Sequence, residues 1–423
     1  MENVIVANGV DEGRDSPIIK WLASALVFIL PLSAHNNALF NYTSIGLLAV
    51  SIVYISQHWQ DITISPTARL FMAGSFAFPI AIALNMWVLG DWQWLWLDNP
   101  SRLMLVLPVF VFMSHIRLNL VWLCLGILAS ACLFGFTAIY QGHVLGMGRV
   151  TGWITVLRSP ITFGNAALLF SVLSVASYPF ISQKIGWKWS GLIVVLAVVL
   201  AAYASLLSGT RGGWISVLFL LMVLFFAGSK RSPLANVLAP VVAVALFIVA
   251  YISIDSVSAR IDHAWNELVN MAQNGVFTNG SVGTRLQMWW AAVLIFLDTP
   301  VWGVGLGNYH DAKLTLIDQG VITSAISRFG YAHSEPFHYL AETGLMGILP
   351  LLGFYVAGFW LVIKSMPFNR KIAVMAMLVL VLRFDISLTQ MQFIYHYTTL
   401  LYAMMFAVLA GLMCNPRYQS NQG

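Results

Sequence analysis

The chain has 423 residues, of which 59% are hydrophobic and only 9% are charged, and its formal net charge is +5. Soluble domains carry about 25% charged residues, so this composition excludes a soluble protein and predicts an all-α integral membrane protein. A transmembrane β-barrel would show short segments of alternating hydrophobicity instead. The small charge is spread over loops, which indicates no nucleic-acid partner.

Apolar segments of roughly 20 residues recur along the chain and predict about twelve transmembrane helices. Residues 1–20 lack a basic region beside a short apolar one, so we expect the first apolar segment to stay in the membrane uncleaved. Three regions follow: an N-terminal bundle of about nine helices over 1–254, a long hydrophilic loop over 255–335, and about three helices with a short tail over 336–423. The expected spans are 21–38, 41–56, 70–89, 102–116, 120–140, 160–181, 191–209, 212–228, 234–254, 336–363, 372–390 and 393–414.

The distribution of basic residues predicts the orientation in the membrane. If the N-terminus is cytoplasmic, twelve of the 21 Lys and Arg residues fall on the cytoplasmic side, against five in the short loops of the other side. Cytoplasmic loops hold the excess of Lys and Arg in membrane proteins. We therefore expect both termini in the cytoplasm, and the 255–335 loop in the periplasm of a bacterium with its spans in the inner membrane.

The long loop should itself contain helices. Apolar residues recur at helical spacing over 261–272 and predict an amphipathic helix on the membrane surface. A second helix is expected to begin at Arg285, with Thr284 as its N-cap in a Thr-x-x-Gln capping box. Its apolar run over 288–297 is too short to span a membrane, which favours a re-entrant or interfacial helix. The alternating glycines of 303–308 fit either a flexible turn or a loop that approaches a ligand closely.

Three residues form the candidate site, because each is placed at the start of a helix on the periplasmic side. Arg211 follows Thr210 at the start of the eighth span, Arg285 opens the predicted loop helix, and His333 precedes Ser334, a plausible N-cap. Helix N-termini favour anions, and arginine binds phosphate groups through planar, bidentate contacts. The two arginines are therefore candidate diphosphate ligands. Beside such positive charge a histidine should stay neutral, so His333 is a candidate general base.

Each of these residues also has a structural reading. An arginine near lipid headgroups, a surface salt bridge and a helix-start histidine bonded to the backbone would explain Arg211, Arg285 and His333 in turn. Ser334 and His338 are candidate substrate-binding residues, although a buried pair of His338 with Glu342 at i+4 is the favoured alternative.

Two further features of the sequence bear on the chemistry. Arg383 and Asp385 are expected to form a local charge pair near the end of the eleventh span. The chain has no Asp-x-Asp, His-Glu-x-x-His or Walker-type motif, so we predict neither a metal site nor a cofactor.

These residues resemble the O-antigen ligase (WaaL) family, within the superfamily of O-antigen polymerases and protein O-oligosaccharyltransferases. That family has about a dozen spans, a GT-C-like architecture and a long periplasmic loop before a late span. Its motif is His-(Asn/Ser/Gln)-x9-Gly-x-x-(Gly/Thr/Tyr), which His333-Ser334, Gly344 and Gly347 satisfy. Arg211 and Arg285 match its conserved arginines by their positions at helix starts.

The resemblance implies a glycosyltransferase of lipopolysaccharide biosynthesis. Its donor would be O-antigen on undecaprenyl diphosphate and its acceptor a sugar hydroxyl of lipid A–core, with membrane lipids around it. Arg211 and Arg285 would hold the diphosphate, and His333 would deprotonate or orient the acceptor. Because the carrier already activates the sugar, the reaction would need neither ATP nor a metal, and direct attack would invert the anomeric configuration.

Other functions stay open at this stage. An O-antigen polymerase or a protein O-oligosaccharyltransferase belongs to the same superfamily, but the Arg-x10-Gly pattern of polymerases is absent after both arginines. A polysaccharide or lipid transporter would usually show paired repeats and charges at the membrane midplane, and this sequence shows neither.

Overall fold

The computed structural model describes residues 16–152, 159–210, 251–252, 255–274 and 280–421, together with Leu220. This part of the chain is helical and contains no strand. The helices are α1 (Pro17–Ser33), α2 (Asn37–Gln57), α3 (Pro66–Leu89), α4 (Trp94–Leu105), α5 (Leu107–Met113), α6 (Leu120–Ile139), α7 (Pro160–Ile185), α8 (Trp187–Ser208), α11 (Asp255–Asn274), α12 (Ser281–Asp298), α13 (Tyr309–Asp318), α14 (Glu335–Ser365), α15 (Arg370–Thr389) and α16 (His396–Cys414). Short helical turns are η1 (Trp59–Asp61), η2 (Tyr140–Val144), η3 (Ser324–Ile326) and η4 (Pro416–Asn421).

The prediction of an all-α membrane protein is confirmed. Among the described residues, nine helical segments are long and apolar enough to cross a membrane, with α4 and α5 together forming one of them. α1 is apolar but has 17 residues. Ten of the twelve predicted spans thus coincide with helices. The predicted spans 212–228 and 234–254 lie outside the described residues, apart from Leu220 and residues 251–252.

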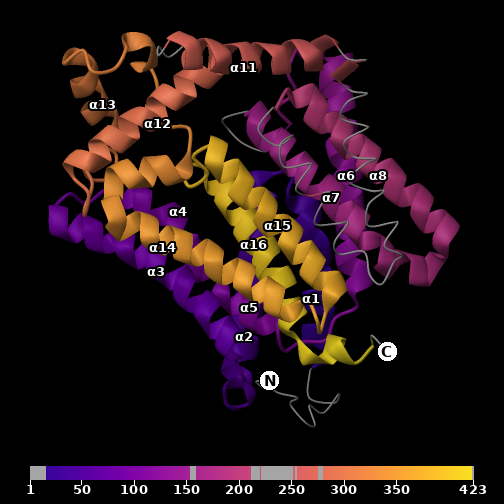
Figure 1. Cartoon of the computed structure of the whole chain (residues 1–423). Helices are drawn as coiled ribbons and strands as arrows, with labels where there is room; N and C mark the ends of the chain where they lie inside the picture. The colour runs from indigo at the N-terminus through magenta and orange to yellow at the C-terminus, as the bar shows by residue number, and fades with distance from the viewer. Residues whose placement is uncertain are drawn as a thin grey trace.

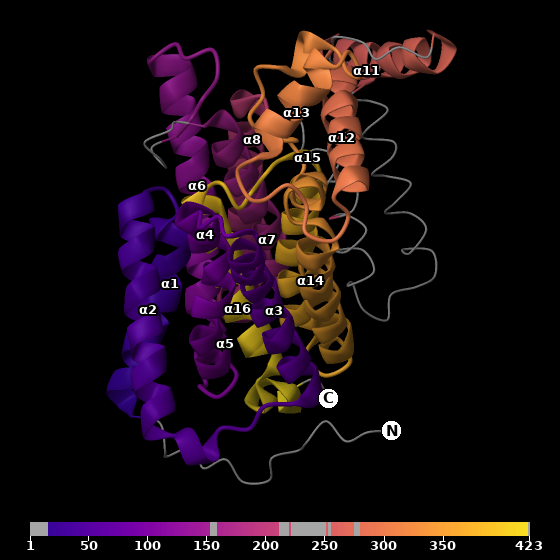
Figure 2. The ribbon, with the colours of Figure 1, turned by 90° about the vertical axis from the view of Figure 1, so that its left-hand side faces the viewer.

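The spanning helices form a bundle with two distinct ends (Figures 1 and 2). α11 lies across one end, roughly at right angles to the bundle, and α12 and α13 lie beside it; we call this end the loop face. α1 starts and α16 ends at the opposite end, the terminal face, where the Tyr418 hydroxyl hydrogen-bonds to the backbone of Leu118. α16 is almost entirely buried and forms the centre of the bundle.

The local sequence explains where several helices begin and end. α3 and α7 each start with a serine N-cap, Ser65 and Ser159, followed by proline in the first turn, and proline fits there because that N–H has no partner within the helix. α3 ends at Gly90 in the left-handed conformation, which favours glycine at a helix C-terminus.

The predicted amphipathic helix of the loop corresponds to α11. Trp265 is 65% exposed and Leu268 is 43% exposed, whereas Glu267 is 5% exposed. Apolar side chains therefore remain uncovered on this helix, while the carboxylate of Glu267 points into the protein, where it contacts the start of α12.

The arrangement leads to a test of the predicted orientation. A cysteine introduced at Gln273, which is exposed on α11, should react with a membrane-impermeant maleimide added to intact cells, because we expect the loop face to be outside the cytoplasmic membrane. A cysteine at the exposed Lys188, at the terminal face, should react only after the cells are opened. The parent chain, with its three native cysteines, gives the background. Labelling of Lys188→Cys and not of Gln273→Cys would contradict the orientation.

Candidate active site

His333 occupies an unusual backbone position at the loop face. Its φ of 48° makes it the one non-glycine residue with positive φ among the described residues. This conformation is rare for residues with a side chain and often marks a functional site. The half-buried ring lies 4.6 Å from the ring of Tyr331 and 5.4 Å from that of Phe329, measured between centroids.

The surroundings of His333 keep its imidazole neutral. Burial, and to a smaller extent the positive charge of Arg285 and the proximity of His338, together lower the pKa of His333 to about 4. The predicted direction is therefore confirmed, although burial contributes more than the arginine. A neutral imidazole at pH 7 can accept a proton from a hydroxyl group.

Arg285 lies on α12, but not at its first position. α12 begins at Ser281, with Gly280 at the N-cap position, so the predicted Thr284 cap is wrong. The Thr284 hydroxyl instead donates to the carbonyl of Gly280 at 2.6 Å, from inside the first turn. The capping box is also absent, because the backbone N–H of Thr284 donates to the carbonyl of Gly280 at 2.9 Å, and the side-chain oxygen of Gln287 accepts a hydrogen bond from the Thr323 hydroxyl at 2.5 Å.

The cap of α12 comes from another helix. One carboxylate oxygen of Glu267, on α11, accepts hydrogen bonds from the backbone N–H groups of Val282 and Gly283, each at 2.9 Å. A carboxylate at this position accepts hydrogen bonds from N–H groups that have no partner within the helix, and its negative charge interacts favourably with the helix dipole. The protein's own carboxylate thus occupies the start of α12, so any contribution of Arg285 to anion binding would have to come from its half-buried side chain.

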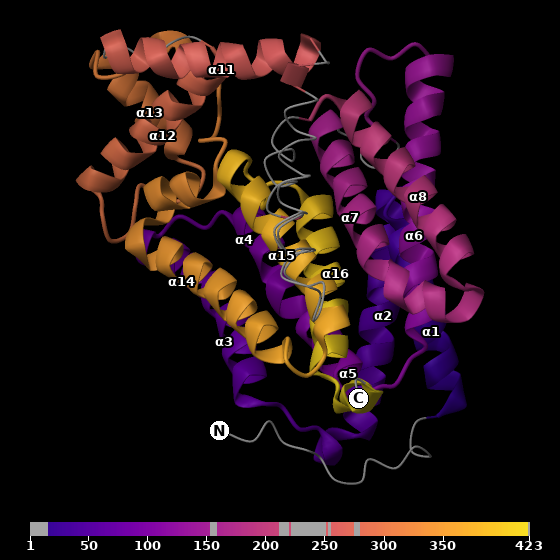
Figure 3. The ribbon, with the colours of Figure 1, turned by 45° about the vertical axis from the view of Figure 1, so that its right-hand side comes forward.

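Arg211 lies outside the described residues. The residue before it, Thr210, is at the loop face, where its hydroxyl donates to the carbonyl of Pro160 at the start of α7 at 3.0 Å. Arg149 also contacts the C-terminal end of α8, because its Nε donates to the carbonyl of Ser208 at 2.9 Å. The C-terminal end of α8 and the N-terminal end of α14 both lie toward the loop face (Figure 3).

A buried ion pair anchors the helix that follows His333. Glu335 is fully buried at the start of α14, and its oxygens lie 3.0 and 3.1 Å from the guanidinium nitrogens of Arg383 on α15. Glu335 also accepts the N–H groups of Gln392 and Phe393, at 3.1 and 3.0 Å. Arg383 therefore has an ion-pair partner that the sequence did not predict, a carboxylate 48 positions earlier, while its predicted pairing with Asp385 stays a prediction.

Ser334 and His338 point away from open surface. Ser334 is the N-cap of α14 by position, with Pro336 in the first turn as predicted, but its hydroxyl makes no capping bond. His338 is fully buried, and its Nε2 lies 3.2 Å from a carboxylate oxygen of Glu342, so the predicted i,i+4 contact is confirmed. Neither nitrogen of His338 has a well-aligned hydrogen bond among the described residues. Substrate binding by Ser334 or His338 stays a prediction, and burial disfavours direct contact.

Gly344, part of the histidine motif, breaks α14. Its φ of 56° and ψ of −150° are not helical, and the next two N–H groups donate to Pro300 and Val301 at 2.9 and 3.1 Å. A Cβ added at Gly344 would lie 2.6 Å from the carbonyl oxygen of Pro300, and one at Gly303 would lie 2.3 Å from the backbone of Glu342. The start of the glycine segment 303–308 is therefore not a free turn, because Gly303 to Gly305 pack against the backbone of α14 just before its break. Close approach of this segment to a ligand stays a prediction.

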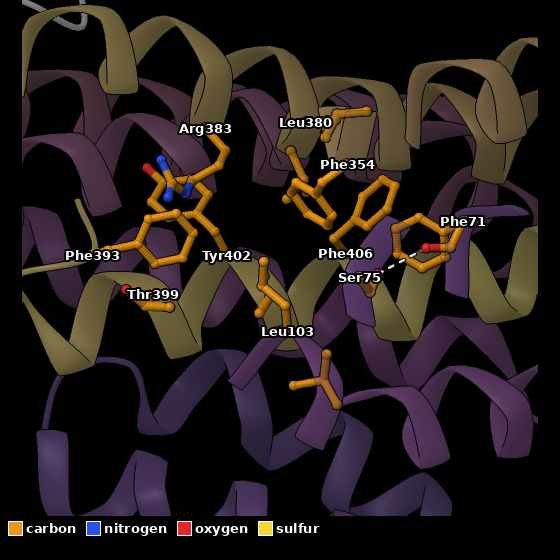
Figure 4. Close-up of a pocket in the computed structure, with 13 residues that line it drawn as sticks. Phe71, Ser75, Leu103, Phe354, Leu380, Arg383, Phe393, Thr399, Tyr402 and Phe406 are labelled. Atoms are coloured by element: carbon orange, nitrogen blue, oxygen red, sulfur yellow. Dashed lines mark hydrogen bonds between the residues drawn. The ribbon is translucent and has the colours of Figure 1, made fainter. Parts of the chain in front are cut away.

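A small apolar cavity lies deeper in the bundle (Figure 4). Arg383 lies at one end beside Phe393 and Tyr402, and Phe71 and Phe406 lie at the other. His333 and Arg285 do not line this cavity. The candidate site is therefore the loop-face surface around His333, not this cavity.

Glu267 and Glu335 fix the helices that carry Arg285 and follow His333, but the sequence did not identify either carboxylate as part of the site, nor Lys313 on α13. One feature of the sequence could have drawn attention to Lys313: it is the one lysine expected on the periplasmic side. Glu267 and Glu335 gave no such signal, because their partners are distant in sequence.

Comparisons with known proteins point to one family. Residues 196–352 match the family described as O-antigen ligase. The match runs from α8 to the middle of α14 and includes the positions of Arg211, Arg285 and His333. A Haemophilus influenzae (strain ATCC 51907 / DSM 11121 / KW20 / Rd) protein of uncharacterised function is 22% identical over 333 residues, which cover 77% of this chain and 81% of the relative. The family match supports membership of the O-antigen ligase superfamily.

Proposed function

We propose that this protein is an O-antigen ligase, which transfers O-antigen polysaccharide from undecaprenyl diphosphate to a sugar hydroxyl of lipid A–core at the periplasmic face of the bacterial inner membrane. One observation supports this proposal most strongly. A half-buried histidine with a positive φ angle lies at the loop face, packed against the rings of Tyr331 and Phe329 and exposed to the charge of Arg285, within the region that matches the family.

The proposed reaction follows from these two side chains. The acceptor hydroxyl loses its proton to a nitrogen of His333 as its oxygen bonds to the anomeric carbon. The bond between that carbon and the phosphate oxygen breaks, and undecaprenyl diphosphate leaves with the electron pair. Arg285 stabilises the growing negative charge on the diphosphate, together with Arg211 if the sequence-based assignment holds. Attack opposite to the leaving group inverts the anomeric configuration.

An O-antigen polymerase is the main alternative, because the family match supports a ligase- or polymerase-type activity. A polymerase would use the same donor and the same arrangement of base and arginine, with a second lipid-linked chain as acceptor. The two activities differ in what accumulates when the enzyme is lost.

The lipopolysaccharide profile of a deletion strain separates the two activities. Loss of the ligase should leave lipid A–core without any O-antigen, while lipid-linked polymer accumulates. Complementation with the wild-type gene should restore the capped chains, and complementation with His333→Ala should not. A profile with a single repeat unit still attached to the core would contradict the ligase proposal and support a polymerase.

A further inference from the structure

Lys313, on α13, is a buried cation that the proposed reaction does not use. Its side chain is 0% exposed. The Nζ atom donates to the carbonyl oxygens of Ile326, at 2.9 Å, Ser327, at 3.3 Å, and Phe329. It also lies 3.3 Å from Nδ1 of His310. The ammonium group is thus held by main-chain carbonyls of one short segment.

Burial of this ammonium group is unfavourable in itself. Lysine is rarely buried without a carboxylate partner, and burial lowers the pKa of Lys313 to about 8. Below that pH the protein keeps a buried charge whose hydrogen bonds go mostly to the 326–329 segment. An apolar side chain of the same length would fill the space without this desolvation, but it would leave three carbonyl groups without that donor.

The segment that Lys313 holds leads directly to His333. The carbonyl oxygen of Phe329 accepts a hydrogen bond from Lys313. The Phe329 ring packs in a T-shaped arrangement with the His333 imidazole, with 5.4 Å between centroids and an angle of 84° between planes. Ile326 and Ala332 are buried in a small apolar cluster with residues of α12, the helix that carries Arg285. On the other side of His333, the ion pair of Glu335 with Arg383 fixes the start of α14.

We infer that Lys313 is a positioning residue, whose ammonium group fixes the 326–329 segment and thereby holds His333 in its strained, half-buried conformation. The inference rests on the proposed function only for its catalytic consequence. The placement of His333 can be measured without any glycosyl donor.

The test is the pH dependence of His333 modification by diethyl pyrocarbonate, which reacts with neutral imidazole. In the purified wild-type protein the reaction rate should stay constant from pH 7 to pH 5, because the pKa of His333 is about 4. In Lys313→Met the segment should relax and His333 should become hydrated. Its midpoint should then move toward the ordinary value of 6.5, and the rate at pH 5 should fall. Peptide mass spectrometry reports His333 separately from His143, an internal reference bonded to Tyr203.

Two further variants make the result decisive. Lys364→Met removes an exposed lysine that lies over the Trp360 ring at the end of α14, and it should leave the profile of His333 unchanged. Lys313→Gln keeps two N–H donors without the charge and should give an intermediate midpoint; it decides the outcome if Lys313→Met does not fold. A wild-type His333 profile in the folded Lys313 variant would overturn the inference.

The catalytic consequence is measured separately on the same proteins. Lys313→Met should lower the turnover number by up to about 100-fold, since small displacements of a catalytic group have effects of that size, while the donor Kd changes little. A shifted His333 profile with unchanged transfer would retain the positioning role and refute the assignment of His333 as the base. An unshifted profile would refute the positioning role whatever the activity.

Discussion

His333→Ala is expected to reduce glycosyl transfer by about 100- to 10,000-fold, the usual contribution of a general base. The lowered pKa of His333 favours its neutral form at pH 7, the form that can accept a proton from the acceptor. Alanine removes the imidazole, which is the proposed proton acceptor, without adding bulk to the segment. The donor should still bind, because the change leaves Arg285 in place.

The measurement is transfer of lipid-linked polysaccharide to lipid A–core by the purified variant, after its folding has been checked by size-exclusion chromatography and thermal unfolding. His58→Ala is a suitable control, because this histidine is the C-cap of α2, whose C-terminal end lies toward the terminal face, and it hydrogen-bonds to the carbonyl of Tyr54. Near-normal turnover in His333→Ala would show that this histidine is a structural residue at the start of α14.

Arg285→Lys is expected to lose most activity although the charge is kept. Arginine offers several N–H donors in a planar fork, whereas lysine offers a compact charge. Loss of one or two hydrogen bonds to a charged ligand should weaken binding of the donor diphosphate by about 10- to 100-fold. Arg211→Lys should behave alike, a prediction that rests on the sequence because Arg211 lies outside the described residues.

Donor binding can be followed by titrating each folded variant with lipid-linked substrate. Arg102→Lys provides the control, since Arg102 forms a local pair with Asp98 at 2.9 Å and has no proposed role. Wild-type affinity in Arg285→Lys would mean that this side chain only supplies charge near His333. In that case the His333 midpoint, rather than the donor Kd, should respond to Arg285→Gln.

The sequence predicted the membrane fold well, because a run of apolar residues is a local signal. Each described spanning helix coincides with such a run. The connection between α7 and α8 and the C-terminal end of α14, which carry lysines predicted to be cytoplasmic, lie toward the terminal face, whereas α11 to α13 lie at the loop face. The orientation in the membrane stays a prediction.

The site was predicted only in part, because its framework depends on contacts between distant residues. Thr284 looked like an N-cap, but Glu267 on α11 provides the cap from outside the helix and allows α12 to start earlier. Arg383 is paired across 48 positions with Glu335. The glycines of 303–308 suggested mobility, yet Gly303 is needed for backbone packing against Glu342. None of these partners can be inferred from residue spacing.

The central claim is a division of labour in which His333 handles the proton and Arg285 the diphosphate. The most direct measurement is the turnover number and the donor Kd of reconstituted wild type, His333→Ala and Arg285→Lys, assayed side by side with EDTA present. We expect His333→Ala to lose turnover with an unchanged Kd, and Arg285→Lys to show a weakened Kd. Loss of donor binding in His333→Ala, with unchanged binding in Arg285→Lys, would contradict the account.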